Sequence, residues 1–202
     1  EPVSTIGEQR VTNTYLQYKT RGQFVAAVLD GLPEAPQYFA HNAAMNRRGP
    51  ELVDWNAESL PQVAASAELS NPERYFVVDV REAGDYAAGH VPNSVNIGLR
   101  GRFETWTGIM VPWDSNLVVV GRAEDLPEAI HRLHRVGYKA QVLTYDAWQK
   151  AGLPIVKTSP VLPQELYAAM QREDSPLVVD VRLPKEWEEL RIGTVVNMPL
   201  NH

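Results

Sequence analysis

The sequence contains no cysteine, and this absence excludes several chemistries at once. Without a thiol the chain cannot form disulfides, Cys-ligated zinc sites or iron–sulfur clusters, and it cannot use a thiolate as a nucleophile. Long apolar runs are missing as well, since none approaches the roughly 18 residues that a membrane span needs. No secretory signal pattern is visible. We therefore expect a cytoplasmic protein with no membrane partner.

Positive charge is also in short supply. Lysine and arginine number 19 against 25 aspartates and glutamates, which gives a net charge of −6. Because nucleic-acid-binding domains usually carry a basic patch, this balance argues against a nucleic-acid partner. The composition is otherwise that of a folded globular chain, with 44% hydrophobic and 22% charged residues.

An internal repeat is the main organising feature of the sequence. The segment Tyr75–Arg81 reads YFVVDVR, and Pro176–Arg182, 101 residues later, reads PLVVDVR. Seventeen residues after the Asp of each segment comes an Asn in a similar frame, Asn96 and Asn197. The spacing predicts one complete copy of a domain and the first part of a second copy.

The repeat suggests where the domains begin and end. We expect a complete domain over residues 55–157 and the truncated start of a second one over 158–202. Residues 1–54 offer only one helix candidate, introduced by a capping box at Thr20 and Gln23, and then a tail rich in Asn, Arg and Pro. One helix cannot bury a core alone, so this segment reads as the end of a preceding domain.

The complete copy alternates apolar strand-like runs with amphipathic helical stretches. Asp125 and Glu128 form an N-terminal capping pattern for one helix, and Gly137 is expected to end it. The expected strands are 75–80, 95–97, 117–120 and 140–145, and the expected helices are 60–69, 82–88, 126–136 and 146–151. Such alternation predicts an α/β fold with a parallel sheet between two layers of helices.

The motifs of this copy resemble the rhodanese homology domain. A strand ends in Asp79-Val80-Arg81, a short helix follows, and then comes Gly89-His90-Val91-Pro92. Gly137-Tyr138 and Ala151–Pro154 resemble the closing motifs of that family. The resemblance covers about 100 residues and implies a rhodanese-like three-layer fold.

The N-terminal segment resembles a second family. Ser4–Gln9, Leu32–Phe39 and Met45–Pro50 look like the C-terminal tail of metallo-β-lactamase-fold persulfide dioxygenases, some of which carry rhodanese domains behind the metal domain. The resemblance implies that the partners are an upstream metallo-β-lactamase domain and a downstream rhodanese domain of one parent chain. It also implies non-haem iron, or zinc, in the upstream domain. The family's His-x-His-x-Asp-His motif is not in this sequence, so we assign neither metal nor cofactor ligands to it.

The rhodanese resemblance places the nucleophile at the end of the third strand, and this position is Gly121. Glycine carries no nucleophile, so we assign no catalytic residue. The loop that follows contains Glu124 and Asp125, whose carboxylates would repel an anionic substrate. In the second copy the equivalent position would fall near 222, beyond His202.

Several polar residues admit a functional and a structural interpretation. His131 and His134 lie on one face of a helix, as in a zinc site, but no third ligand is identifiable and a solvated face is the simpler interpretation. His90 is favoured as a structural residue of its turn. Asp79 and Arg81 are favoured as a structural ion pair, because both copies contain them.

Residues 98–113 are expected to form a basic, aromatic loop with Arg100, Arg102 and Trp106. Such a loop could hold an anionic thiol such as a glutathione persulfide, or it could pack against the preceding domain. We favour packing, because the copy has lost its nucleophile.

The sequence thus predicts a non-catalytic rhodanese-like module from a persulfide dioxygenase–sulfurtransferase of sulfide or persulfide metabolism. Two alternatives stay open: a sulfurtransferase whose Cys lies in the second copy, and a pseudo-rhodanese that binds a ligand or partner near Gly121–Asp125. The apolar run Thr194–Leu200 needs strand partners, so we expect exposed apolar surface at the ends and a homo-oligomer.

Overall fold

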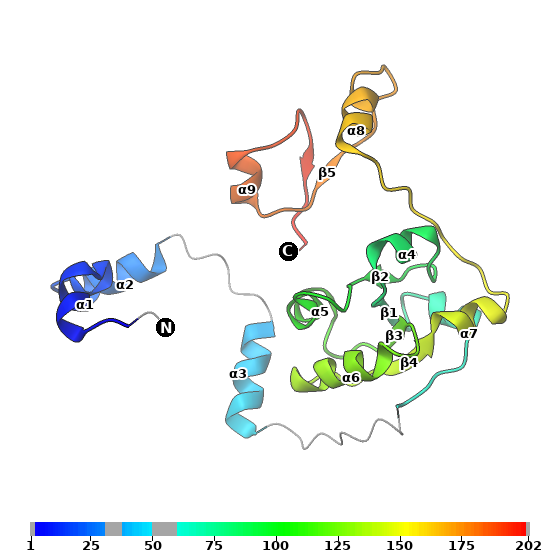
Figure 1. Cartoon of the computed structure of the whole chain (residues 1–202), viewed down its shortest axis with the longest axis horizontal. Helices are drawn as coiled ribbons and strands as arrows, with labels where there is room; N and C mark the ends of the chain where they lie inside the picture. The colour runs from blue at the N-terminus through cyan, green and yellow to red at the C-terminus, as the bar shows by residue number, and fades with distance from the viewer. Residues whose placement is uncertain (1–2, 31–37, 50–59, 201–202) are drawn as a thin grey trace. The chain divides into compact units, whose positions relative to one another are not determined.

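The computed structural model describes residues 3–30, 38–49 and 60–200 (Figure 1). Contacts divide the chain into two compact units, residues 1–35 and 36–202. Most of the Leu32–Phe39 motif and the expected boundary between residues 54 and 55 lie outside the described residues. None of the helices described is long and apolar enough to cross a membrane.

The first unit is more helical than its sequence indicates. It contains α1 (Ile6–Thr12), a 3-10 helix η1 (Thr14–Leu16) and α2 (Arg21–Leu29). The capping box at the start of α2 is confirmed, because the side chains of Thr20 and Gln23 each accept a hydrogen bond from the other's backbone N–H, at 3.2 and 3.3 Å. Neither α1 nor α2 has a buried residue, so these two helices form no core of their own.

A four-stranded parallel sheet is the centre of the second unit. Its strands are β1 (Phe76–Asp79), β2 (Val95–Asn96), β3 (Leu117–Gly121) and β4 (Gln141–Thr144), in the order β2-β1-β3-β4. All five residues of β3 are buried, which is typical of a parallel strand covered on both faces. The alternation of strands and helices predicted from the sequence is confirmed.

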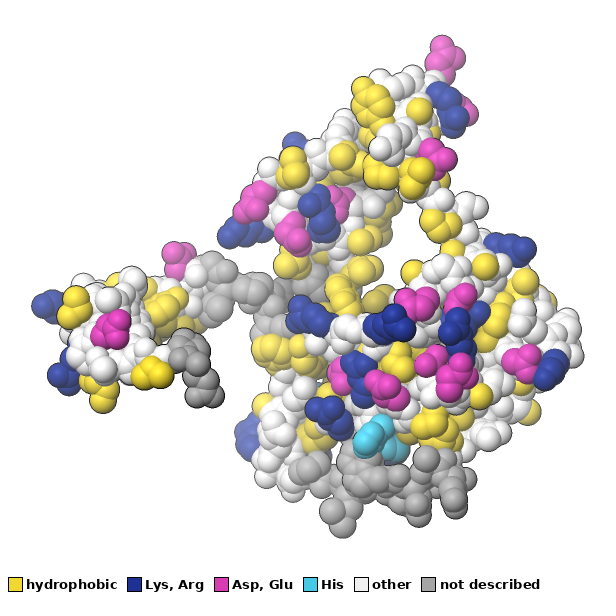
Figure 2. Space-filling model, viewed as in Figure 1, with side chains coloured by type: hydrophobic (Ala, Val, Ile, Leu, Met, Phe, Trp, Pro, Cys, Tyr) yellow, Lys and Arg dark blue, Asp and Glu magenta, His cyan; other side chains and the backbone are white. Residues whose placement is uncertain are grey.

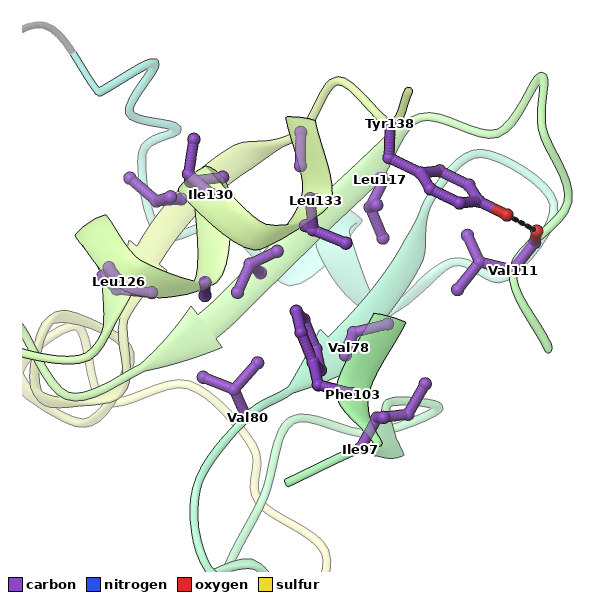
Figure 3. Close-up of a cluster of buried hydrophobic side chains, with 14 residues drawn as sticks. Val78, Val80, Ile97, Phe103, Val111, Leu117, Leu126, Ile130, Leu133 and Tyr138 are labelled. Carbon is purple, nitrogen blue, oxygen red and sulfur yellow. Dashed lines mark hydrogen bonds between the residues drawn. The ribbon is translucent and has the colours of Figure 1, made fainter. Parts of the chain in front are cut away.

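Helices cover both faces of this sheet and create two apolar clusters. The covering helices are α4 (Ala83–Ala88), α5 (Phe103–Met110), α6 (Leu126–Arg135) and α7 (Tyr145–Lys150). Val78 and Val119 point into one cluster, where they join residues of α5 and α6 (Figure 3). Val77 and Val118 point to the other face, toward Trp148 of α7. The side chains of neighbouring strand residues alternate between the two faces, so β1 and β3 each contribute side chains to both clusters.

Two predictions about local structure are wrong. Residues 60–69 do not form a helix: the chain runs extended beside β4, and the N–H of Val63 donates to the carbonyl of Val142 at 3.0 Å. Only Ala67–Ser70 (η3) form a 3-10 turn. The pairing explains the error, because Val63 and Ala65 alternate toward the sheet with a period of two.

Residues 98–113 are not one loop, because they contain α5. Phe103 and Thr107 of this helix are at most 1% exposed, and the Thr107 hydroxyl donates to the Phe103 carbonyl at 2.9 Å. The sequence does not predict this helix because its buried face includes Thr107 and Gly108, which do not contribute to an apolar stripe.

The C-terminal segment repeats part of this architecture. It contains α8 (Pro163–Met170), β5 (Val179–Asp180), α9 (Pro184–Glu189) and β6 (Val196–Asn197). β5 and β6 are parallel, and Asp180 pairs with Asn197 just as Asp79 pairs with Asn96. The remaining described helix, α3 (Tyr38–Arg48), belongs to the second unit.

Candidate functional site

A pocket of about 670 Å³ opens at the carboxyl ends of β1, β3 and β4. This is the edge where parallel α/β sheets usually bind ligands. Its walls come from the segments that follow the three strands and from the residues after α7. The lining includes Arg81, Asp85, Gly89, Gly121, Arg122, Glu124, Thr144, Tyr145, Asp146 and Lys157.

Gly121, at the position expected for the nucleophile, forms part of the pocket wall. It is the last residue of β3, it is buried, and it pairs with Thr144 of β4. A Cβ atom placed on this glycine would lie 2.8 Å from Cγ2 of Val80 and 3.3 Å from Cδ2 of Leu126. Neighbouring apolar side chains therefore occupy the space that a cysteine side chain would need.

The loop after Gly121 carries mixed charge. Arg122 forms an ion pair with Asp85 at 2.6 Å, while Glu124 is exposed in the same loop. Asp125 is the N-cap residue of α6, as predicted, but its side chain accepts no hydrogen bond from the helix. Figure 2 shows acidic and basic side chains next to one another over the region of α4 and α6. The pocket mouth is thus not the uniformly basic surface that attracts anions.

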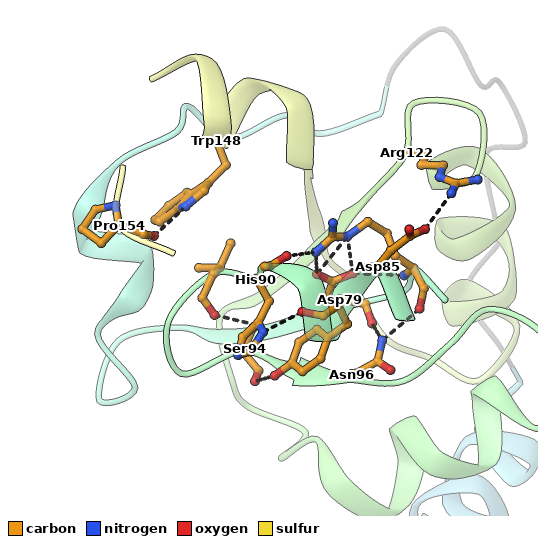
Figure 4. A network of polar contacts seen from close by, with 12 residues as sticks. Asp79, Asp85, His90, Ser94, Asn96, Arg122, Trp148 and Pro154 are labelled. Atoms are coloured by element: carbon orange, nitrogen blue, oxygen red, sulfur yellow. Dashed lines mark hydrogen bonds and ion pairs between the residues drawn. The ribbon is translucent and has the colours of Figure 1, made fainter. Parts of the chain in front are cut away.

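Asp79 and Arg81 form the buried ion pair that the sequence suggested (Figure 4). Nη2 of Arg81 donates to Asp79 at 2.6 Å and to the Gly89 carbonyl at 2.8 Å. The guanidinium also lies 3.5 Å from the centre of the Tyr145 ring. The pair thereby joins the end of β1 to the turn after α4 and to the start of α7.

His90 has the contacts of a structural residue. Its backbone pairs with that of Val156, its Nδ1 lies 2.8 Å from the Tyr86 carbonyl, and its ring stacks on the Tyr86 ring at 3.7 Å. The Tyr86 hydroxyl donates to the Ser94 carbonyl at 2.5 Å. Burial raises the pKa of Tyr86, so the ring stays neutral at ordinary pH.

The two helix histidines remain without a metal role in the part of the chain that the structure describes. Burial lowers the pKa of His134, and the nearby charges of His131 and Lys139 add to this effect. Among the described residues, no group of three or more His, Asp and Glu side chains could hold a metal ion. His131 and His134 therefore belong to no metal-binding group within residues 3–30, 38–49 and 60–200.

The basic, aromatic residues of 98–113 do not reach the pocket. Arg100 pairs with Glu82 at 3.2 Å on the surface, and Trp106 is 41% exposed. Arg102 is the N-cap residue of α5, but its side chain makes no capping hydrogen bond. None of the three is among the described residues that line the pocket. Trp113, at the end of the stretch, stacks on His41 of α3.

Some pocket residues were not identified from the sequence. Tyr145 and Lys157 line the pocket, yet neither belongs to the Asp-x-Arg or Gly-His-Val-Pro motifs. Tyr145 could have been found from its place directly after β4, at the ligand-binding edge of the sheet. Lys157 carries no comparable signal.

A family model described as "Rhodanese-like domain" matches residues 62–151. A search of curated protein sequences finds no match. The chain is similar to a metallo-beta-lactamase structure from Staphylococcus aureus subsp. aureus COL, with 22% identity and a TM-score of 0.54 over 69% of this chain and 40% of that chain. Its likeness to that structure at this identity shows the fold alone.

Two smaller structures are also similar to this chain. A rhodanese-like domain of an Anabaena protein has 20% identity and a TM-score of 0.43, over 52% of this chain and 87% of that one. A rhodanese-related protein from Thermoplasma volcanium has 24% identity and a TM-score of 0.41, over 48% and 97%. The family match coincides with the parallel sheet and its helices: residues 62–151 of this chain form a rhodanese-like domain.

Proposed function

We propose that this rhodanese-like domain is a non-catalytic module of a longer metallo-β-lactamase-fold protein that oxidises persulfides in sulfide or persulfide metabolism. The observation that carries the proposal is the packing around Gly121, where Val80 and Leu126 fill the place of a nucleophile. The side chains around Gly121 therefore leave little room for a cysteine, as expected for a domain that does not transfer sulfur.

The mixed charge of the loop supports the same conclusion. A rhodanese-type reaction needs loop N–H groups and a helix N-terminus free to hold an anionic sulfur group. Here Glu124 is an exposed residue of that loop, and Arg122 forms an ion pair with Asp85. The module would position neighbouring domains in a cytoplasmic homo-oligomer, while iron or zinc and its ligands belong to the upstream domain.

A sulfurtransferase whose Cys lies in the second copy is a second candidate. The side chain of Asn197 donates to the carbonyls of Asp180 and Arg182 at 3.0 and 2.9 Å. Asn96 makes the same two bonds in the first copy, both at 2.9 Å. This agreement favours a second rhodanese-like domain, whose equivalent of Gly121 would lie near position 222.

A ligand-binding role for the first copy is a third candidate, because the pocket remains open despite the lost nucleophile. Thermal stabilisation by thiosulfate or by a persulfide, lost in an Arg122→Ala variant, would favour this role over a purely structural one.

The proposal is tested by restoring the nucleophile. Gly121→Cys should unfold at lower denaturant concentration than the wild type and should form no thiocyanate from thiosulfate and cyanide. Ala123→Cys is the matched control, because Ala123 is an exposed residue of the same loop. Its thiol should react quickly with a disulfide reagent, whereas the thiol at 121 should react slowly. Robust sulfur transfer by Gly121→Cys would contradict a non-catalytic domain.

The role in the parent is tested on the natural full-length protein. Oxygen consumption with glutathione persulfide should be measurable, and Arg122→Ala should change its kcat by less than about twofold. A tenfold loss would show that the module takes part in the reaction. The flanking coding sequence should contain His-x-His-x-Asp-His upstream and a cysteine near position 222. If neither motif is there and no oxygen is consumed, the persulfide dioxygenase assignment is wrong.

A further inference from the structure

Helix α3 has one face that is partly buried although the helix lies outside the rhodanese-like domain. Its half-buried residues include Tyr38, His41, Asn42 and Met45, which follow the i, i+3, i+4, i+7 spacing of a single helix face. The helix has 11 residues. Isolated helices shorter than about 12–15 residues are marginal in water, so α3 needs the surface on which it lies.

That surface contains two positions without a side chain. A Cβ placed on Gly108 of α5 would lie 2.9 Å from Cγ of Tyr38 and 3.2 Å from its Cβ. A Cβ placed on Gly137, after α6, would lie 2.9 Å from the sulfur of Met45. The atoms of Tyr38 are at the base of the ring and cannot swing away. The backbone of α3 can therefore approach this closely only because residue 108 is glycine.

A stack of three rings lies beside Gly137, where an added Cβ would also be 3.5 Å from Nε2 of His41. The His41 ring lies 3.6 Å from that of Trp113, with 6° between their planes, and Trp113 lies 4.1 Å from Tyr138, with 16° between theirs. The Tyr138 hydroxyl donates to the Val111 carbonyl at 2.8 Å, and its ring belongs to the buried cluster of Figure 3. The outer ring of the stack is thus supplied by α3, and the inner ring is fixed in the core of the domain.

The surface is at the opposite edge of the sheet from the pocket. Trp113 precedes β3 and Tyr138 precedes β4, so both lie at the amino ends of these strands. The pocket opens at their carboxyl ends. Occupation of one surface therefore leaves the other accessible.

We infer that Gly108, Trp113, Gly137 and Tyr138 form a helix-docking surface of the rhodanese-like domain, and that its occupant is Tyr38–Arg48 of the same chain. This inference deepens the proposed positioning role, because it names the surface that fixes the segment preceding the domain. It does not depend on the loss of the nucleophile. The family match begins at residue 62, so the docked helix is an addition to the domain.

Hydrogen exchange of the full chain tests the inference with Gly108→Ala. Alanine favours a helix over glycine, so the amides of α5 should keep or gain protection. The new methyl group should displace α3, whose amides should exchange at least about tenfold faster. Gly84→Ala in α4 is the matched control, because a Cβ there meets nothing within 4 Å. It should leave the exchange of α3 unchanged.

A second variant separates the contact from general destabilisation. In a Tyr38→Ala background, Gly108→Ala should change the exchange of α3 by less than about twofold, because most of the colliding atoms are gone. Protection of α3 should also be independent of protein concentration. Three results would overturn the inference: a wild-type α3 that exchanges like an unstructured peptide, a Gly108→Ala variant with normal protection, or protection that rises with concentration, which would mean docking on a second copy. Since the thiocyanate assay of Gly121→Cys is independent of α3, failure of this inference and failure of the proposed function are distinguishable.

Discussion

At the scale of single residues, the same Asp–Arg pair occurs twice in very different surroundings. Nη2 of Arg81 lies 2.6 Å from Asp79, and Nη2 of Arg182 lies 2.7 Å from Asp180. The first pair is at most 6% exposed, whereas the Arg182 side chain is 43% exposed. The sequence identifies both pairs by their motif. It does not show which one is buried, because burial depends on the strands and helices packed around it.

Removal of the arginine should therefore have unequal effects in the two copies. Arg81→Ala leaves the Asp79 carboxylate buried without its counter-ion, and we expect a loss of about 3–5 kcal/mol in the free energy of unfolding. Arg182→Ala is the control, and its effect should be much smaller because water screens the exposed pair. Urea denaturation followed by circular dichroism measures both. Equal effects would show that the first pair is not buried in solution.

A second ion pair gives the stability of the domain a pH dependence. Glu104 of α5 lies 2.5 Å from Arg132 of α6, and hydrogen bonds from Arg132 hold the pKa of Glu104 below its ordinary value. Because the folded pKa is the lower one, this pair contributes its full stability above the unfolded pKa of about 4.3 and loses it as the pH falls.

Glu104→Gln should isolate this contribution. At pH 7 the variant should be less stable than the wild type by up to about 1 kcal/mol, since the pair is partly exposed. At pH 3 the difference should shrink, because the wild-type carboxylate is then becoming protonated. Urea denaturation at both pH values gives the comparison. A difference that grows toward low pH would contradict the pairing.

At the scale of helices and strands, the sequence predicts secondary structure best where an apolar run rich in β-branched residues is compatible only with a strand. The runs around β1, β3 and β4 are strands, as their β-branched residues indicate. The helix predicted over residues 60–69 is wrong because Val63 forms a hydrogen bond with Val142 of β4 and Ala65 packs against the sheet. The helices α1 and α3 were missed because their sequences are polar, and α3 is half-buried only through residues far along the chain. The pocket edge follows from the parallel strands, but the crowding at Gly121 arises from Val80 and Leu126, which only the folded chain brings next to it.

The extended conformation before η3 leads to a prediction about proline. Val63→Pro removes the N–H that donates to Val142, and we expect a loss of about 1–3 kcal/mol in unfolding free energy. Ala67→Pro is the control, because the first position of a helix tolerates proline and Ser66 before it is already extended. It should change stability by less than about 0.5 kcal/mol. If the chain were helical over 60–69, Ala67→Pro would be the more harmful substitution.

At the scale of the whole molecule, apolar surface is concentrated outside the rhodanese-like domain. Leu177 is 81% exposed, Leu190 is 75% exposed and Ile192 is 54% exposed, all in the segment of β5 and α9. β1 is paired on both sides, with β2 and β3, whereas β5 pairs only with β6 among the described residues. Exposed apolar side chains beside an unpaired strand edge favour association.

We therefore expect the 202-residue chain to associate reversibly. Sedimentation velocity over a hundredfold range of concentration should give a weight-average coefficient that rises with concentration. Leu190→Glu should reduce the rise, because burying a carboxylate at a contact is unfavourable. The matched control is Glu188→Gln in α9, the helix that ends at the residue before Leu190, and this variant should sediment like the wild type. A single monomeric species for the wild type at every concentration would contradict association through this segment.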